Sequence, residues 1–276
     1  MDTKTMVKAP RKLPAARLDP SALARKAALY RTLLVIGFFV LWEVLANIGA
    51  IDERSASKPT AILAAFGEMF AGNTDTYQAL SDTLYVLVIA FIIAVAIGMP
   101  LGLALALNAT IREAYMSIVI YLLGIPKTIF LPLFVLFFGL GNGSAIAFGA
   151  VLGFLQITVN VVAGVDSIEP RFFRVASAFG GSKWHSFVHV ILPGAAPAIF
   201  AGLWHGVRNA FIGVLIAQMF VSNIGIGYLV KVYTNNFNID SAMVLIIISA
   251  VAVILLGTLW ELGEARLTKW KSTVRS

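Results

Sequence analysis

Long apolar stretches separated by short polar segments run along this chain. Each stretch is about as long as the roughly 20 residues that a helix needs to cross the hydrocarbon core of a membrane. The pattern therefore predicts an all-α, polytopic membrane protein with six spanning helices, at about 31–50, 82–107, 114–138, 144–166, 195–221 and 241–260.

Two spans carry further signals. Small residues recur every four positions along the second span, which predicts a face that another helix approaches closely; these residues are Ala90, Ala94, Gly98, Gly102 and Ala106. The third span contains Gly124 and Pro126, and a second proline at Pro132. Because proline removes a backbone donor, we expect this span to be broken at Gly124 and Pro126 and again at Pro132.

The longest polar interruption between spans is 169–193. Pro170 suits a first helical position and Gly180 a helix end. Ser182 can cap a second helix that runs into Leu192-Pro193. Apolar residues at helical spacing form a stripe on the first helix: Phe172, Val175, Ala176 and Phe179. The pattern predicts two short helices that either lie on the lipid surface or contact another protein.

Composition supports a membrane protein with one helical bundle. Hydrophobic residues make up 59% of the 276 positions and charged residues 13%, whereas soluble domains carry about 25% charged residues. The chain has no cysteine, which excludes disulfides and thiolate catalysis. Its three histidines lack a metal-binding spacing, so no metal site is expected.

The placement of positive charge predicts the orientation. Sixteen of the 21 lysines and arginines fall in the two tails or in alternate connections, and the other connections hold only Arg54, Lys58 and Lys231. Cytoplasmic segments are the basic ones, so both termini and 169–193 are expected in the cytoplasm. Because the charge flanks membrane spans, the net charge of +7 indicates contact with membrane lipid and no nucleic-acid partner.

The expected organisation is a basic cytoplasmic tail at 1–28, a six-span domain at 29–265 and a C-terminal tail at 266–276. The largest outer segments are 51–80, with a short helix after Pro59, and 222–240. A delivering protein would dock on these outer segments, although simple solvation also explains their polarity.

The segment 174–193 resembles the cytoplasmic loop of binding-protein-dependent ABC importer permeases. That loop has the pattern E-A-A, three residues, G, nine residues, I, one residue, L-P. The matching positions are Ala176, Gly180, Leu192 and Pro193, with Val190 as a conservative match. Arg174 stands where the family has glutamate, and Val175 replaces the first alanine. Segments 124–144 and 192–219 are similar to parts of the nitrate/sulfonate/taurine-type permeases.

The resemblance implies a type I ABC importer permease-like fold in the cell inner membrane. Two permease subunits, expected to be a homodimer, would form the path, and a soluble solute-binding protein would deliver substrate. Each loop would dock on a cytoplasmic ABC ATPase dimer, through Phe172, Arg174, Val175, Ala176, Phe179, Gly180, Leu192 and Pro193. The chain lacks a GxxxxGK[ST] phosphate loop, so we expect no cofactor or catalytic residue here and ATP bound by the partner.

Arg208 is the sharpest candidate for the substrate path, since an ionisable group near the bilayer midplane usually faces a cavity or a partner. His205 and Asn209 share its helical face, whereas Gln218 lies on another face and is not included. The alternative is a structural arginine bonded to carbonyls or to Asn160.

Three other polar residues lie within spans. Lys127 either faces the path or braces the break after Pro126. Gln156 and Asn160 form interhelical hydrogen bonds or contact substrate. Lys127, His205 and Arg208 together favour a small anion such as a sulfonate, nitrate or an organic acid.

Two other functional classes compete with the permease. An ATPase-independent secondary transporter or channel often shows internal repeats, but no clear repeat is present and the 169–193 loop would be unexplained. An intramembrane enzyme would need paired carboxylates or a nucleophile with its base, and the spans contain neither.

Overall fold

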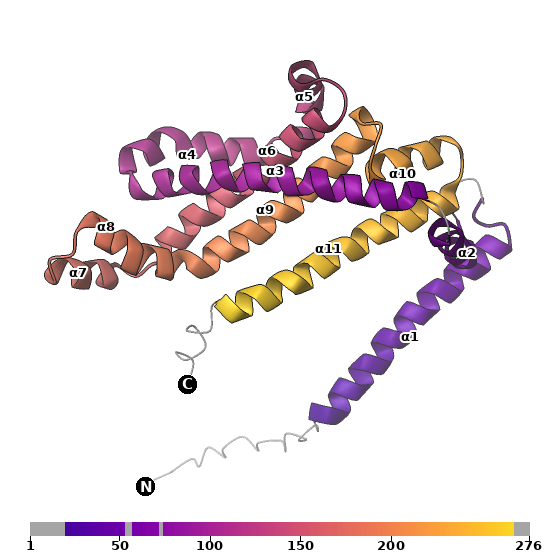
Figure 1. The fold of residues 1–276 in the computed structure, drawn as a ribbon. Coiled ribbons are helices and arrows are strands. Elements are labelled where there is room, and N and C mark those ends of the chain that lie inside the picture. Colours follow the sequence, from indigo (N-terminus) through magenta and orange to yellow (C-terminus); the bar gives the residue numbers. More distant parts are fainter. Residues whose placement is uncertain (1–19, 53–56, 72–73, 268–276) are drawn as a thin grey trace, which may run out of the picture. The chain divides into compact units, whose positions relative to one another are not determined.

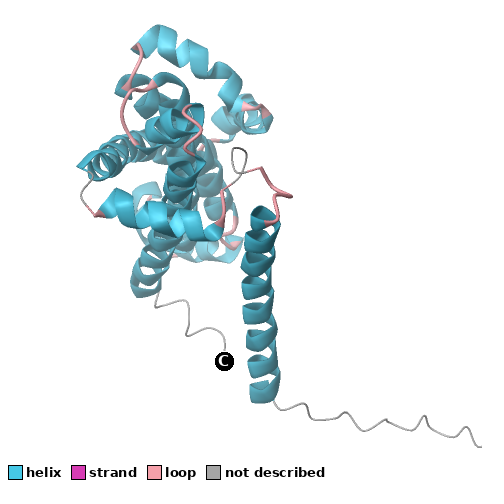
Figure 2. Cartoon of the chain, turned by 90° about the vertical axis from the view of Figure 1, so that its right-hand side faces the viewer, coloured by secondary structure: helices cyan, strands magenta, loops and turns pink. Residues whose placement is uncertain are grey.

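A computed structural model of the protein describes residues 20–52, 57–71 and 74–267. These residues form helices joined by short loops, and the described part of the chain contains no strand (Figure 2). The predicted all-α class is therefore confirmed. Most of the two predicted tails, 1–28 and 266–276, lies outside the described residues.

The chain divides into two units, residues 1–53 and 54–276, and each is described by itself. The described part of the first unit is helix α1, Pro20–Asn47 (Figure 1). It begins before the predicted span because the sequence at 21–28 is rich in strong helix formers. Its apolar part, Ala24–Asn47, is long enough to cross a membrane.

The second unit contains the remaining helices. In chain order they are α2 (Pro59–Phe70), α3 (Thr74–Leu107), α4 (Ala109–Gly124), the 3₁₀ turn η1 (Lys127–Phe130), α5 (Leu131–Phe138), α6 (Asn142–Asp166), α7 (Pro170–Ala178), α8 (Lys183–Ser186), the π-turn η2 (Phe187–Ile191), α9 (Leu192–Val221), α10 (Ile226–Asn235) and α11 (Ile239–Leu267). The short helix expected after Pro59 is α2. The sequence analysis did not anticipate α10.

Helices α3, α6 and α9 pack directly against one another and form the centre of the second unit (Figure 1). The predicted small-residue face of α3 lies in this contact. A methyl group added to Gly98 would approach the carbonyl oxygen of Phe154 to 2.7 Å, and one on Gly102 would approach Val161 Cβ to 2.7 Å. The helices are therefore in backbone contact, which only small residues permit.

The α6–α9 contact is built in the same way. A methyl group on Gly206 would approach Ile157 Cγ1 to 2.5 Å, and one on Gly213 would approach the Cα of Gly149 to 2.9 Å. Thr158, which is fully buried, adds a hydrogen bond across the bundle by donating to the carbonyl oxygen of Gly98 at 3.2 Å. Close packing and this polar contact hold three helices as one block.

The predicted third span is broken at Gly124 and Pro126, as expected. The break turns the chain by 94° between α4 and the η1–α5 segment. Pro132 does not break the chain again, because it lies in the first turn of α5, where a missing N–H is tolerated. The described residues thus include five long apolar helices, or six spans if the bent pair is counted as one.

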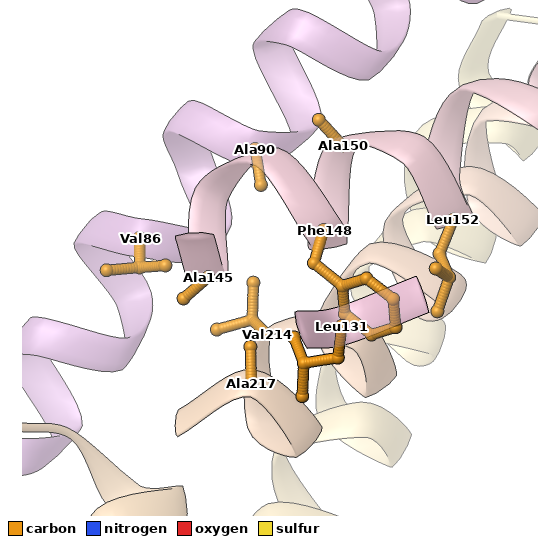
Figure 3. Close-up of a cluster of buried hydrophobic side chains, with 9 residues drawn as sticks. All are labelled: Val86, Ala90, Leu131, Ala145, Phe148, Ala150, Leu152, Val214 and Ala217. Atoms are coloured by element: carbon orange, nitrogen blue, oxygen red, sulfur yellow. The ribbon is translucent and has the colours of Figure 1, made fainter. Parts of the chain in front are cut away.

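The bent segment is held by a buried apolar cluster. Leu131 of α5 and Phe148 of α6 pack there with Val86 of α3 and Val214 of α9 (Figure 3). Each of these residues comes from a different helix, so the cluster fixes α5 against the central block. Helices α7 and α8 lie beyond one end of α6 and α9, and α10 lies beyond the other end (Figure 1).

Gly98→Ala should destabilise the protein, because its methyl group would meet a backbone oxygen that cannot move aside. Overpacking of this kind costs about 1–3 kcal/mol. Gly263→Ala is the matched control: it lies in α11 with nothing within 4 Å of the added methyl group, and alanine favours a helix over glycine. Thermal melting in detergent should show a lower Tm for Gly98→Ala and an unchanged or higher Tm for Gly263→Ala. Equal melting of both variants would contradict the close packing.

Candidate functional site

The loop 169–193 is built by local sequence signals. Pro170 opens α7 at a first-turn position, and Gly180 ends it with φ +72°. The N–H of Gly181 donates to the carbonyl oxygen of Ala176 at 2.9 Å and that of Gly180 to Ser177 at 3.0 Å, a Schellman cap. Ser182 then accepts from the N–H of His185 at 3.2 Å and starts α8. The predictions for Pro170, Gly180 and Ser182 are confirmed.

The second helix of the loop does not end at Leu192-Pro193. It continues through η2 into α9, so that one helical segment runs from Lys183 to Val221. Pro193 cannot donate to a carbonyl of the preceding turn, and the π-turn η2 ends at Ile191, just before α9 begins. The loop is therefore joined to the central block without a break.

The apolar stripe of α7 is exposed. Phe172, Val175 and Phe179 are 49%, 55% and 88% exposed. Phe173, by contrast, turns inward against the buried cluster around Ile191 and Val165. One side of α7 thus attaches the loop to the bundle and the other side presents apolar groups outward.

Two hollows flank this stripe. The first, of about 560 Å³, lies between α7 and the α8–η2 segment, and it is lined by Phe172, Val175, Ala176, Phe179, Gly180, Gly181, Ser182, His185, His189 and Val190. The second, of about 630 Å³, includes Pro193 at the start of α9. Leu192 is 46% exposed at the same place. Six of the eight predicted coupling residues therefore line these two hollows, which share Phe172, and Arg174 and Leu192 line neither.

The charges of this surface are mostly basic. Arg171 pairs with Glu169 at 2.7 Å and lies 5.1 Å above the ring of Phe172. Arg174 and Lys183 are exposed. Neither has a side-chain partner in the part of the chain that the structure describes.

An ion pair that the sequence analysis did not identify lies beside the loop. Arg112, at the start of α4, donates two hydrogen bonds to Asp166, at the end of α6, at 2.7 and 2.5 Å. Asp166 is four residues before α7, so the pair ties the α3–α4 turn to the base of the loop. The partners are 54 residues apart, and no local pattern connects them.

The candidate path residues lie along α6 and α9. Arg208 is exposed in the middle of α9, and within the described ranges its side chain has no hydrogen-bond or ion-pair partner. His205 and Asn209 are half-buried beside it, and the Asn209 amide donates to the His205 carbonyl at 2.8 Å.

Gln156 and Asn160 of α6 lie at a similar depth. A methyl group on Gly202 would approach Asn160 Cβ to 2.6 Å, which places Asn160 one turn of α9 away from His205. The Asn160 amide donates to the carbonyl oxygen of Gln156 at 2.8 Å, within its own helix. These five polar residues therefore lie at a similar depth, but the α9 face that packs on α6 consists of Gly202, Gly206 and Gly213, and exposed Arg208 lies away from that face.

Lys127 belongs to a different site. Its ammonium group donates to the carbonyl oxygen of Leu123 at 2.9 Å, where the break after Gly124 leaves an acceptor free. This geometry favours the bracing interpretation over the path. The lysine also borders an apolar hollow of about 330 Å³ that phenylalanines of α5 and α6 line.

A buried polar cluster joins α3, α9 and the first residues of α10. Thr83 donates to the amide oxygen of Gln218 at 3.0 Å, and both side chains are almost fully buried. The N–H of Ile226 donates to Thr83 at 2.8 Å and that of Gly227 to Gln218 at 3.3 Å. Side chains of two other helices therefore cap α10. Gln218 does lie on another face from Arg208, but the sequence analysis missed this capping role.

Comparison with known proteins places these features in one family. The model of the binding-protein-dependent transport system inner membrane component matches residues 98–270. The taurine transport system permease protein TauC of Escherichia coli strain K12 is 28% identical over 262 residues, covering 92% of this chain and 93% of that protein.

A second relative is also a transport permease by name, and a solved structure has a similar fold. The putative aliphatic sulfonates transport permease protein SsuC of Bacillus subtilis strain 168 is 26% identical over 243 residues, covering 87% of each protein. A chain of the inward-facing MetNI methionine ABC transporter has a TM-score of 0.62 at 18% identity, covering 71% of this chain and 95% of that one. This last likeness concerns the fold, and it agrees with the predicted ABC importer permease-like architecture.

Thr83→Val should lower the Tm, because it leaves the N–H of Ile226 without an acceptor in a buried place. Such a loss costs about 1–3 kcal/mol. Thr234→Val is the control, since that exposed hydroxyl donates only to a carbonyl of its own helix, Val230, at 2.7 Å. A Thr83→Val protein that melts like Thr234→Val would refute the capping role.

Proposed function

The chain belongs to the family of binding-protein-dependent transport system inner membrane components, the permeases of ABC importers, and we propose that it lines the path of a small organic anion. One observation carries the proposal: an exposed arginine without a partner stands halfway along a spanning helix. With a rise of 1.5 Å per residue, Arg208 is roughly 24 Å from Leu192 and about 20 Å from Val221.

A cation at this depth is costly unless it faces water, a partner or a bound anion. Among the described residues no carboxylate reaches Arg208, so the positive charge is available to a substrate. His205, Asn209, Gln156 and Asn160 supply hydrogen-bond donors at the same depth. One cation with several neutral donors suits an anion that binds weakly and moves from one donor to the next.

Exposed Arg208 cannot face lipid at low cost, so the path lies between this chain and a second permease subunit. A second copy of the chain is the simplest partner, because two copies would place the same polar residues on both sides of a shared path. The soluble solute-binding protein delivers substrate to this path from outside.

The second functional surface is the loop 169–193, which contains α7. Its exposed apolar stripe suits a helix-in-groove contact with a cytoplasmic ATPase, with Arg174 and Lys183 at the rim. ATP is bound and hydrolysed by that separate ATPase dimer, and the permease contributes no catalytic residue or cofactor. The loop therefore lies in the cytoplasm, both termini are cytoplasmic, and the protein resides in the cell inner membrane.

The connection between loop and path explains how ATP could drive transport. The helix from α8 through η2 leads directly into α9, which carries Arg208. Closure of the ATPase dimer would move α7 and α8, and α6 and α9 would follow as one block because they are in backbone contact. The path would then alternate between inward-open and outward-open states by a rigid-body motion.

The substrate class follows from the charge and from two relatives. Arg208 with neutral donors favours an anion, and the two relatives are named for taurine and aliphatic sulfonates, which share a sulfonate group. We therefore assign this permease to small sulfonates or similar organic anions.

Replacing Arg208 with glutamine should reduce uptake of the anionic substrate, because a charge-assisted hydrogen bond of about 1.5–3 kcal/mol is lost. This corresponds to a roughly tenfold to hundredfold lower rate, since about 1.4 kcal/mol is tenfold. Arg208→Lys should retain more uptake than Arg208→Gln, and both should assemble with the ATPase normally. Uptake that is indifferent to both substitutions would remove Arg208 from the path.

Phe179→Ser should weaken binding of the ATPase to the permease in nanodiscs by about tenfold to a hundredfold, since burial of a phenylalanine is worth about 1.5–3 kcal/mol. The permease itself should melt as before, because this ring is 88% exposed. Ser177→Ala is the control, as helical geometry places it roughly opposite the apolar stripe. Equal ATPase affinity for both variants would show that α7 is not the docking helix.

A further inference from the structure

The turn between α10 and α11 contains a phenylalanine in a backbone conformation that is uncommon for this residue type. Phe237 has φ +57°, and it is the one residue other than glycine with a positive φ in the described part of the chain. In this region the Cβ of an L-residue crowds its own backbone. Glycine or asparagine is the usual choice there, and a bulky residue is an outlier.

Hydrogen bonds on both sides hold the phenylalanine in this conformation. The N–H of Phe237 donates to the carbonyl oxygen of Thr234 at 3.1 Å, and that of Asn238 to Tyr233 at 2.9 Å, which forms a Schellman cap on α10. Asn238 then accepts from the N–H of Ser241 at 3.2 Å and caps α11. The turn is therefore specified by the hydrogen bonds of two helix ends.

The ring of Phe237 does not serve the packing of this chain, because the residue is 72% exposed. Its neighbours Asn235, Asn236 and Asn238 are exposed as well. The chain thus keeps a strained aromatic residue at a position where glycine would fit better, and it leaves the ring exposed in a run of exposed asparagines. Strain retained in this way is typical of functional sites.

We propose that Phe237 is the aromatic anchor through which the solute-binding protein docks on the outer face of the permease. This inference rests on the orientation given under the proposed function, which puts 222–240 outside. Aromatic residues, phenylalanine among them, are enriched in the cores of protein–protein interfaces, and polar residues form the rims. A turn specified by hydrogen bonds adds affinity because little freedom is lost on binding.

A membrane anchor explains the residue less well. Tyrosine and tryptophan form interfacial belts because their polar tips reach the headgroups, and phenylalanine has no such tip. Three exposed asparagines next to Phe237 in the sequence also favour an aqueous surface over the hydrocarbon edge.

The attachment of α10 gives docking a direct mechanical consequence. Thr83 of α3 and Gln218 of α9 hold the first N–H groups of α10, so a force on α10 acts on both helices. Gln218 lies ten residues beyond Arg208 on α9. Docking at Phe237 is therefore connected to the helix that lines the path.

The decisive test uses Phe237→Gly, in which folding and docking should change in opposite directions. Glycine relieves the strained backbone, so the Tm should stay the same or rise. Affinity of the intact importer in nanodiscs for its substrate-loaded solute-binding protein should fall at least tenfold, while Phe237→Trp should retain most of it. Unchanged affinity in Phe237→Gly would overturn the proposal.

Cysteine labelling separates this inference from the orientation on which it rests, since the chain has no cysteine. Asn236→Cys should react with a membrane-impermeant maleimide added outside intact cells. If it reacts only from the inside, both the orientation and the docking proposal fail. If it reacts from outside but a nitroxide on Phe237→Cys is reached by lipid-soluble and not by water-soluble relaxation agents, only the docking proposal fails. A water-exposed nitroxide that becomes immobile when the solute-binding protein is added supports it.

Discussion

Backbone-to-backbone contact among α3, α6 and α9 is the constraint on which the rest of this structure depends. Glycines on each helix, such as Gly98, Gly153 and Gly206, leave no room for even one added methyl group. Packing in lipid gains little from the hydrophobic effect, so close contact and interhelical hydrogen bonds must hold the helices together. The result is a block whose two ends cannot move independently.

That block connects three surfaces that would otherwise be unrelated. At one end, the α7 loop is attached through Phe173 and a continuous helix into α9, and the Arg112–Asp166 pair lies at its base. At the other end, α10 is capped by side chains of the block itself. Arg208 lies between them. The import mechanism that we propose requires coupling of this kind, with the α7 loop as the cytoplasmic contact, α10 on the outer side and Arg208 in the path.

Features that depend on local chemistry were predictable from the sequence. Apolar runs defined the spans, glycine and alanine at every fourth position marked the close face of α3, and Pro170, Gly180 and Ser182 set the helix ends of the loop. Features that depend on distant partners were not predictable. Thr83 and Gln218 are 135 residues apart, the 94° turn after α4 depends on how α5 packs, and nothing about phenylalanine suggests a positive φ at Phe237.

The central claim is that this chain forms the translocation path of an importer and depends on a separate ATPase subunit for energy. The most direct measurement is uptake of a radiolabelled sulfonate into proteoliposomes that contain this chain alone, this chain with its ATPase, or both together with the solute-binding protein. We predict uptake only in the complete system, and only with ATP. Concentration-dependent uptake by this chain alone would contradict the account and identify a self-contained transporter or channel.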